Sequence, residues 1–181
     1  MESALERTAS RISRDPWDES PVRGLPSTAA IAGHPIHPMM IPYPVAFLTT
    51  ALVTDVLASR SDDRFWRRAT SLLIGAGIVT GLAAGVAGAI DYFTIKRARE
   101  KPAGKIHAYG NVVALSLAAA NLASRSRKDD GPSAADLTLT AATAALVGVT
   151  GWMGAELSYR HMVGVAGHGD QHGHEEKRVI H

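Results

Sequence analysis

Eight side chains that can bind metals, carry protons or form strong hydrogen bonds fall at four separate points of this chain. They are His34 and His37, Asp91 and Tyr92, His107, and then Glu156, Tyr159 and His161. Imidazole nitrogens bind Zn, Cu and Fe, including the iron of haem. Because imidazole titrates near neutral pH, the same groups could instead relay protons. The residue types therefore indicate metal, haem or proton chemistry, provided that the fold brings the four points together.

Four long apolar stretches connect these points, and each is long enough to cross a membrane. We expect helices at about residues 39–58, 69–92, 106–123 and 137–160. A helix of about 20 apolar residues spans the hydrocarbon core of a bilayer, and neither Ser71–Ile90 nor Leu137–Ala155 contains a charge. A soluble amphipathic helix would instead carry a polar face along its length. The sequence predicts an all-α protein, a four-helix transmembrane bundle.

Four crossings would gather the candidate residues at one membrane face. Helix 1 then begins, helix 2 ends, helix 3 begins and helix 4 ends on the same side, which is where the histidines and acids lie. The predicted ligands of a metal or haem are His34, His37, His107 and His161. The residues expected to surround and orient them are Asp91, Tyr92, Asn111, Glu156, Tyr159 and Arg160. For haem, a histidine of the helix 1 entry would have to lie opposite His107 or His161 across the ring plane.

The entry to helix 1 is the most specific local motif, Gly-His-Pro-Ile-His-Pro at residues 33–38. Each histidine precedes a proline, which disfavours the α region and favours an extended backbone. A polyproline helix has three residues per turn, so His34 and His37 would point the same way as a stiff pair. The alternative is a proline-rich turn whose histidines only lie at the membrane interface. The nearby acids also have an alternative, a salt-bridge ring that closes the bundle without any further role.

Small and polar residues predict which helix faces pack inside the bundle, because helices in lipid associate through close backbone approach. The expected inward faces are Gly77, Gly81, Gly85 and Gly88 in helix 2, then His107, Asn111, Ala114, Ala118 and Asn121 in helix 3, and Ala141, Ala144, Gly148, Gly151 and Ala155 in helix 4. Asp55, near the other end of helix 1, is expected to pair with the basic segment 64–68 or to cap backbone groups. Similar endings of helices 2 and 4 suggest a repeat of two parallel hairpins.

Polar segments flank the apolar region. Residues 1–30 and 166–181 are expected to be disordered tails around a membrane domain at 31–165, because such compositions cannot bury enough apolar surface. The C-terminal tail is His-rich and either binds metal ions loosely or is an ordinary polar tail. We expect no cleavable signal peptide and both termini on one side of the membrane. The basic residues lack an accompanying recognition helix or stacking aromatics, which argues against nucleic-acid binding.

Taken in order, these motifs resemble the bacterial family of predicted membrane proteins called domain of unknown function 2231. The resemblance covers about residues 31–165 and rests on residues 33–38, Ile90-Asp91-Tyr92, His107 with Asn111, and residues 151–165, Gly-Trp-Met-Gly-Ala-Glu-Leu-Ser-Tyr-Arg-His-Met-Val-Gly-Val. It implies a four-helix domain with no established activity. Some relatives are joined to Rieske-type ferredoxin domains, which implies electron transfer by analogy, although this chain carries no such domain.

The function predicted from these observations is electron transfer in the bacterial plasma membrane by haem b or a transition metal (Fe, Cu or Zn) bound at the histidine and carboxylate cluster. One alternative is a non-catalytic anchor or subunit of a redox complex, and another is a small transporter or proton pathway. Against a pathway, helix 2 is small and apolar from Ser71 to Ala89. Nucleophilic hydrolysis is disfavoured because the chain has no cysteine and no serine elbow. The expected partners are the lipid bilayer, a redox protein such as a Rieske-type ferredoxin, and, as a further option, a second copy of the chain.

Overall fold

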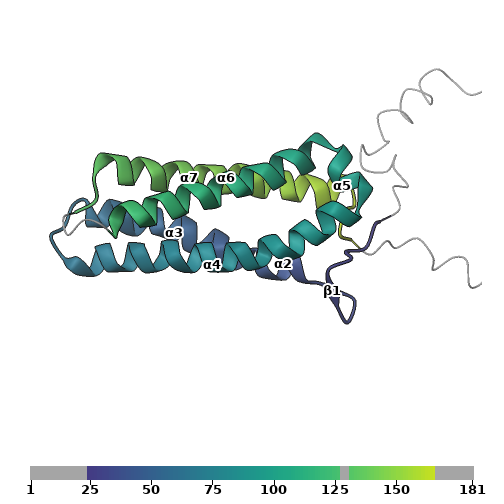
Figure 1. The fold of residues 1–181 in the computed structure, drawn as a ribbon, viewed down its shortest axis with the longest axis horizontal. Helices are drawn as coiled ribbons and strands as arrows, with labels where there is room; N and C mark the ends of the chain where they lie inside the picture. Colours follow the sequence, from purple (N-terminus) through teal and green to yellow (C-terminus); the bar gives the residue numbers. More distant parts are fainter. Residues whose placement is uncertain (1–23, 127–130, 166–181) are drawn as a thin grey trace, which may run out of the picture.

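Four helices that are long and apolar enough to cross a membrane make up most of the computed structural model, which describes residues 24–126 and 131–165 (Figure 1). They span Ile36–Ala58, Arg64–Thr94, Pro102–Arg125 and Ala134–Arg160, with lengths of 23, 31, 24 and 27 residues. At about 1.5 Å per residue, each is longer than the roughly 30 Å of bilayer hydrocarbon. The predicted all-α transmembrane bundle is confirmed. The expected tails at 1–23 and 166–181, including the His-rich segment, lie outside the described residues.

Short elements interrupt or extend the four spans. In chain order the elements are β1 (Ala30–Ile31), β2 (His34–Pro35), α2 (Ile36–Met40), α3 (Pro42–Ala58), α4 (Arg64–Thr94), α5 (Lys96–Glu100), α6 (Pro102–Arg125), α7 (Ala134–Ala155) and the π-helical turn η1 (Glu156–Arg160). Proline begins α3 and α6, where its missing N–H costs no helical hydrogen bond. A capping box between Ser133 and Asp136 starts α7.

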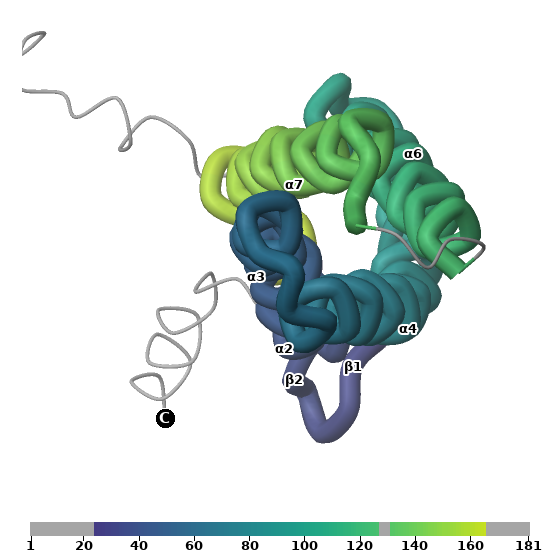
Figure 2. The backbone as a smooth tube through the Cα atoms, turned by 90° about the vertical axis from the view of Figure 1, so that its left-hand side faces the viewer, coloured from purple at the N-terminus to yellow at the C-terminus, as the bar shows by residue number. Residues whose placement is uncertain are grey.

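The helices form two antiparallel hairpins, α3 with α4 and α6 with α7. α3 also packs against α7, and α4 also packs against α6, so the four helices surround one common core (Figure 2). The first hairpin therefore begins, and the second hairpin ends, at the same end of the bundle. That end also carries β1, β2 and α5 (Figure 1).

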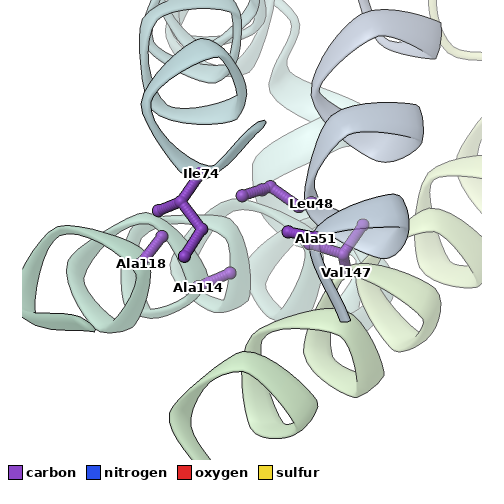
Figure 3. Close-up of a cluster of buried hydrophobic side chains, with 6 residues drawn as sticks. All are labelled: Leu48, Ala51, Ile74, Ala114, Ala118 and Val147. Carbon is purple, nitrogen blue, oxygen red and sulfur yellow. The ribbon is translucent and has the colours of Figure 1, made fainter. Parts of the chain in front are cut away.

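An apolar layer fills the middle of the bundle (Figure 3). Its buried members are Leu48, Ala51, Ile74, Ala114, Ala118 and Val147. Gly77 and Gly81 let α4 approach its neighbours, because an added Cβ would lie 2.6 Å from a Leu48 side-chain atom or 2.7 Å from one of Leu115. Polar side chains lie on both sides of this layer, toward the two ends of the bundle.

The outer surface of the bundle is apolar along the helices. Leu72, Val79 and Val86 on α4 are 74%, 67% and 65% exposed, and contact with lipid accounts for such exposure where contact with water would not. Most exposed aromatic rings lie toward the end that carries β1 and β2, at Tyr43, Phe93, Tyr109, Trp152 and Tyr159, whereas Phe65 lies at the other end. Aromatic rings concentrate at membrane interfaces, so the end with β1 and β2 is expected to lie near the lipid headgroups.

The segment before β1 is ordered, although the sequence assigned residues 24–30 to a disordered tail. The N–H of Leu25 donates to the carbonyl of Met162 (2.9 Å), and the N–H of Gly164 donates to the carbonyl of Leu25 (2.8 Å). We call residues 24–29 the N-terminal strap. The expectation of disorder considered only the local composition, whereas the groups that hold the strap come from the end of α4 and from the far end of the chain.

The inward face of α7 differs from the one predicted. Gly148 and Gly151 face open space, whereas Thr140, Thr143 and Val147 are buried. The buried hydroxyl of Thr143 donates to a carbonyl of its own helix at 2.8 Å, so it needs no water inside the bundle. The inward face of this helix could not be predicted from small residues alone. A threonine whose hydroxyl is bonded to its own helix packs almost as an apolar residue does.

Matched contacts relate the two hairpins. A hydrogen bond joins Thr54 on α3 to Thr70 on α4 (2.9 Å), and another joins Ser124 on α6 to Asp136 on α7 (3.0 Å). The offset in sequence from Thr54 to Ser124 is the same as that from His37 to His107, two histidines described below. The offset from Thr70 to Asp136 is the same as that from Gly88 to Gly154, the glycines that face these histidines. These correspondences support the hypothesis that the membrane domain is a repeat of two hairpins.

Candidate functional site

His37 on α2 and His107 on α6 meet inside the bundle, at the end that carries the N-terminal strap. Their ring centres are 5.8 Å apart and their planes differ by 87°. His107 follows His37 at the same separation in sequence as Ser124 follows Thr54, which is the offset of the hairpin repeat. The structure therefore brings together two of the four predicted ligands, one from each hairpin. We call them the histidine pair.

Each ring of the histidine pair is held by a backbone carbonyl of the next helix in its own hairpin. Nδ1 of His37 lies 2.8 Å from the carbonyl oxygen of Ala84, and Nδ1 of His107 lies 2.8 Å from that of Thr150. A carbonyl can only accept, so each Nδ1 must carry the hydrogen. In the neutral ring, Nε2 is then unprotonated and keeps its lone pair. Both imidazoles thus present the nitrogen that binds a metal or accepts a proton.

A glycine lies against each ring. A Cβ added at Gly88 would be 2.8 Å from Cε1 of His37, and one added at Gly154 would be 2.9 Å from Cε1 of His107. Gly154 follows Gly88 at the offset that relates the second helices of the two hairpins, in agreement with the repeat. The two glycines of α4 and α7 therefore make room for the imidazoles, whereas the sequence had attributed Gly88 to helix packing alone.

Asn111 adds a second support for His107 only. Its Nδ2 donates to the His107 carbonyl (2.8 Å) and lies 3.4 Å from Nε2, while its Oδ1 accepts from Thr150 Oγ1 (2.9 Å). Asn111 thus lies beside His107, the histidine that the sequence expected it to orient. The equivalent position in the first hairpin is Ile41, which has no polar side chain. The ring of His107 is thus tied to α7 by more polar contacts than the ring of His37 is tied to α4.

The remaining two predicted ligands lie outside the histidine pair. His34 is exposed in β2, and His161 follows η1, with its carbonyl accepting from Arg97 Nη1 at 3.1 Å. Across residues 24–126 and 131–165, no group of three or more histidine and acidic side chains is arranged to hold a metal ion. The four-histidine ligand set is therefore not assembled there, and two imidazoles remain.

The conformation of the helix 1 entry explains why the two neighbouring histidines diverge. His37 is helical, in α2, whereas His34 lies in a strand. The predicted extended conformation of His37 was wrong because Pro38 falls in the first turn of α2, where its lack of an N–H is tolerated. His37 consequently points into the bundle while His34 stays outside.

Asp91 at the end of α4 holds the N-terminal strap. Its carboxylate accepts from Ser27 Oγ (2.7 and 2.9 Å), from the N–H of Thr28 (2.8 Å) and from the N–H of Ala29 (3.1 Å). These donors occupy the carboxylate of Asp91, so it holds the strap. The sequence had instead suggested that it supports the histidines or joins a salt-bridge ring. The donors could not be found from the sequence because the strap had been assigned to a tail.

Replacing Asp91 with alanine is expected to release the strap while the four helices remain folded. The change removes hydrogen bonds to a charged acceptor, which contribute about 1.5–3 kcal/mol each when well formed. Hydrogen exchange at the amides of Thr28 and Ala29 should accelerate at least about tenfold, as measured by mass spectrometry in detergent. Asp62→Ala, at the other end of the bundle, is the control. Unchanged exchange in Asp91→Ala would refute this role.

The other predicted supporting residues lie around the rim. Glu156 Oε1 accepts from Arg160 Nη1 (3.0 Å) one turn away on an exposed surface. Tyr159 is 79% exposed. Tyr92 packs with a small apolar cluster of α5, α6 and η1 and has its ring 5.5 Å from that of Phe93. These residues lie at the end of the bundle where the membrane interface is expected.

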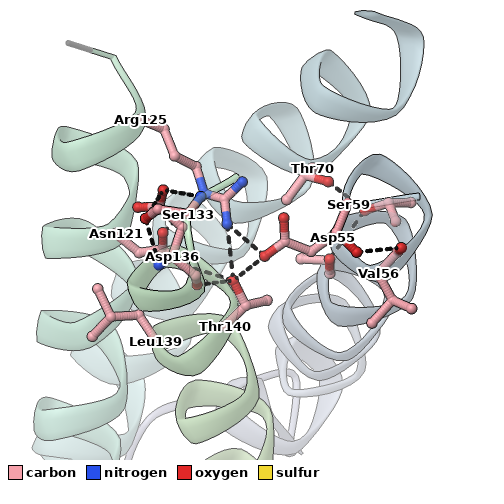
Figure 4. A network of polar contacts seen from close by, with 12 residues as sticks. Asp55, Val56, Ser59, Thr70, Asn121, Arg125, Ser133, Asp136, Leu139 and Thr140 are labelled. Atoms are coloured by element: carbon pink, nitrogen blue, oxygen red, sulfur yellow. Dashed lines mark hydrogen bonds and ion pairs between the residues drawn. The ribbon is translucent and has the colours of Figure 1, made fainter. Parts of the chain in front are cut away.

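A second polar site, which the sequence did not reveal, lies at the opposite end of the bundle (Figure 4). Asp55 on α3 forms a salt bridge with Arg125 at the end of α6, and their side chains are 0% and 9% exposed. The predicted partner of Asp55, the basic segment 64–68, was wrong. Asp55 and Arg125 are separated in sequence by the same offset as the histidine pair, so the hairpin repeat is the signal that could have identified them as partners.

Neighbouring polar groups complete this second site. Asp55 Oδ2 also accepts from Thr140 Oγ1 (2.7 Å), and Arg125 Nε donates to Asn121 Oδ1 (2.9 Å). Asn121 Nδ2 in turn donates to Thr140 Oγ1 (2.7 Å). Residues of α3, α6 and α7 are thus joined in one buried network, as a charged pair inside a membrane domain requires.

The sequence profile of a family described as predicted membrane protein, DUF2231, matches residues 33–167. No curated protein and no solved structure matches the chain. The matched region contains both members of the histidine pair, both glycines that face them, and the second polar site.

Proposed function

Because the chain belongs to the DUF2231 family and is an integral membrane protein with four apolar helices, we propose that its histidine pair binds haem iron or another transition-metal ion for electron transfer. The observation that carries the proposal is that Nδ1 of each ring lies within hydrogen-bond distance of a backbone carbonyl. In the neutral rings this leaves two unprotonated Nε2 atoms within one half-buried pair. Metal-binding histidines commonly have their other nitrogen bound in this way.

The separation of the rings suits a shared metal ion. With metal–nitrogen distances of about 2.0–2.1 Å, two imidazoles on one ion have ring centres roughly 5–6.5 Å apart, the larger value when they face each other across the ion, and the pair has 5.8 Å. Two protein ligands are too few for a structural zinc site, which takes four. They are sufficient for haem iron, because the macrocycle supplies the other four nitrogens. The donor set therefore favours haem over a bare ion.

In this proposal the protein positions the group and isolates it. When bound, haem would supply one-electron chemistry. His37 and His107 would hold the iron, Ala84 and Thr150 would fix the rings, and the apolar layer would exclude water on the side of the membrane interior. The same layer separates the histidine pair from the second polar site, which weakens the alternative of a transporter or proton pathway.

Further parts of the proposal concern location and partners. The bridge between Leu25 and Val163 supports placing both chain ends on one side of the bacterial plasma membrane. The exposed face around the strap would then receive an electron-transfer partner, for which an iron–sulfur protein of the Rieske type is our candidate. A second copy of the chain could pack through the exposed small residues of α7.

The test is the optical spectrum and metal content of protein purified in detergent from cells grown with adequate iron. We expect a Soret band that shifts on reduction and about one iron per chain. His37→Ala and His107→Ala should each lose the band while keeping helical circular dichroism. His34→Ala and His161→Ala, which lie outside the pair, should retain it.

Three results would overturn the proposal in whole or in part. A folded wild-type protein with neither haem nor a stoichiometric metal leaves the pair without a ligand. A band that survives both His37→Ala and His107→Ala would show that haem is bound elsewhere. Stoichiometric zinc without colour would retain the metal site but exclude electron transfer.

A further inference from the structure

One oxygen of the second polar site has no hydrogen-bond partner. Asp55 is completely buried, and its Oδ1 is the sole buried side-chain nitrogen or oxygen without a partner in the described parts of the chain. A buried carboxylate oxygen normally accepts at least one hydrogen bond, from protein or from ordered water. The orphaned atom therefore points to a donor that the protein itself does not supply.

The geometry of the salt bridge shows where that donor would lie. Arginine and carboxylate commonly pair through two parallel hydrogen bonds. Here, both Arg125 Nη2 and Thr140 Oγ1 donate to the same oxygen, Oδ2. No hydrogen bond from Arg125 Nη1 to a described residue is observed, so one N–H donor and one carboxylate acceptor of the same ion pair are left over.

We propose that a water molecule is bound at Asp55 Oδ1, inside the membrane domain, and bridges it to Arg125 Nη1. Water can accept from the guanidinium and donate to the carboxylate at once, which completes the pair. Our candidate acceptor for its second hydrogen is Thr70 Oγ1, which donates to the hydroxyl of Thr54, the sequence neighbour of Asp55. Thr70 and the Asp55 carboxylate lie on the same side of the network in Figure 4.

The local charge favours a neutral ligand over a cation. Arg125 already neutralises Asp55, so a sodium or potassium ion at Oδ1 would face the guanidinium across a short, poorly screened distance. A proton on Oδ1 would create a new donor, which would need an acceptor in turn. Water satisfies the oxygen without adding charge, so it fits the site better than either.

The water would exchange with one side of the membrane only. Arg125 is the last residue of α6 and its side chain is 9% exposed, so the site adjoins the loop end. The apolar layer of Leu48, Ile74 and Val147 closes the other side. This assignment does not depend on the proposed function, because the histidine pair lies beyond that layer.

The test is infrared difference spectroscopy of the full-length protein in lipid, comparing ordinary water with water labelled with oxygen-18. We expect an isotope-sensitive O–H band from an isolated water, absent from the variant Asp55→Leu/Arg125→Met. Thr138→Val, an exposed position on α7, should keep the band. Asp55→Asn should keep it at higher frequency, since an amide oxygen is the weaker acceptor, and this variant serves if the double variant does not fold.

Three outcomes would overturn the assignment. The band could be absent from folded wild-type protein, or it could persist unchanged in both Asp55 variants. A saturable shift of the Asp55 carboxylate band on addition of sodium chloride, but not of choline chloride, would identify a cation site instead.

Discussion

Replacing Arg125 with methionine is expected to lower the free energy of unfolding of the membrane domain by about 3–5 kcal/mol. The change leaves the buried Asp55 carboxylate without its positive partner and with Thr140 as its remaining donor. Methionine keeps much of the volume of arginine, so lost packing contributes little. The measurement is unfolding by sodium dodecyl sulfate in mixed micelles, followed by far-ultraviolet circular dichroism.

Two controls separate the buried charge from other effects. Asp55→Leu/Arg125→Met removes both charges and should recover most of the loss, because apolar replacement of a whole buried pair is often neutral or stabilising by about 1–4 kcal/mol. Arg160→Met breaks an exposed pair with Glu156 and should cost at most about 1 kcal/mol. If the double variant were as unstable as Arg125→Met, an uncompensated charge would not be the cause.

The position of this ion pair also favours packing of the first hairpin against the second over packing of two identical hairpins. Asp55 and Arg125 are equivalent in the repeat, as are His37 and His107. Two copies of the first hairpin would bring acid against acid, and two copies of the second would bring arginine against arginine. Like charges at a buried contact cost several kcal/mol, so the pair favours one hairpin of each kind. The histidine pair, with identical members, supplies no such preference.

The helices and the end of the bundle that holds the histidines could be predicted because both follow from local properties. Apolar length defines a crossing, and an even number of crossings decides which helix ends share a face. The inward seam of α6 was also predicted, since an asparagine such as Asn121 would lack partners in lipid, and it is 1% exposed. These inferences need no knowledge of which helix lies beside which.

The partners of the two acids could not be predicted because they depend on contacts between distant segments. Asp91 takes its donors from the strap, far back along the chain, and Asp55 takes its cation from the other hairpin. The helix predicted at 106–123 ended before Arg125, although the side chain of this residue lies inside the polar network. Only the hairpin repeat, compared between its two copies, relates these distant residues.

Adding one methyl group at Gly88 or Gly154 is expected to weaken the binding of haem by about 10–100-fold, although neither variant alters a proposed ligand. In Gly88→Ala and Gly154→Ala the new Cβ would lie 2.8 or 2.9 Å from a histidine Cε1. The imidazole is the movable partner, so it should tilt and lose its Nδ1 bond to the carbonyl. Haemin titration of the apoprotein, followed at the Soret band, measures the change.

The same two helices provide matched controls, because Gly85 and Gly148 have no atom within 4 Å of an added Cβ. Gly85→Ala and Gly148→Ala should bind haemin as the wild type does, and each should gain up to about 1 kcal/mol in stability, since alanine favours the helix over glycine. A general effect of the methyl group would weaken binding in all four variants. Unchanged affinity in Gly88→Ala and Gly154→Ala would mean that the close approach of glycine to imidazole serves packing alone. The affinity for haem would then not depend on the orientation of the rings.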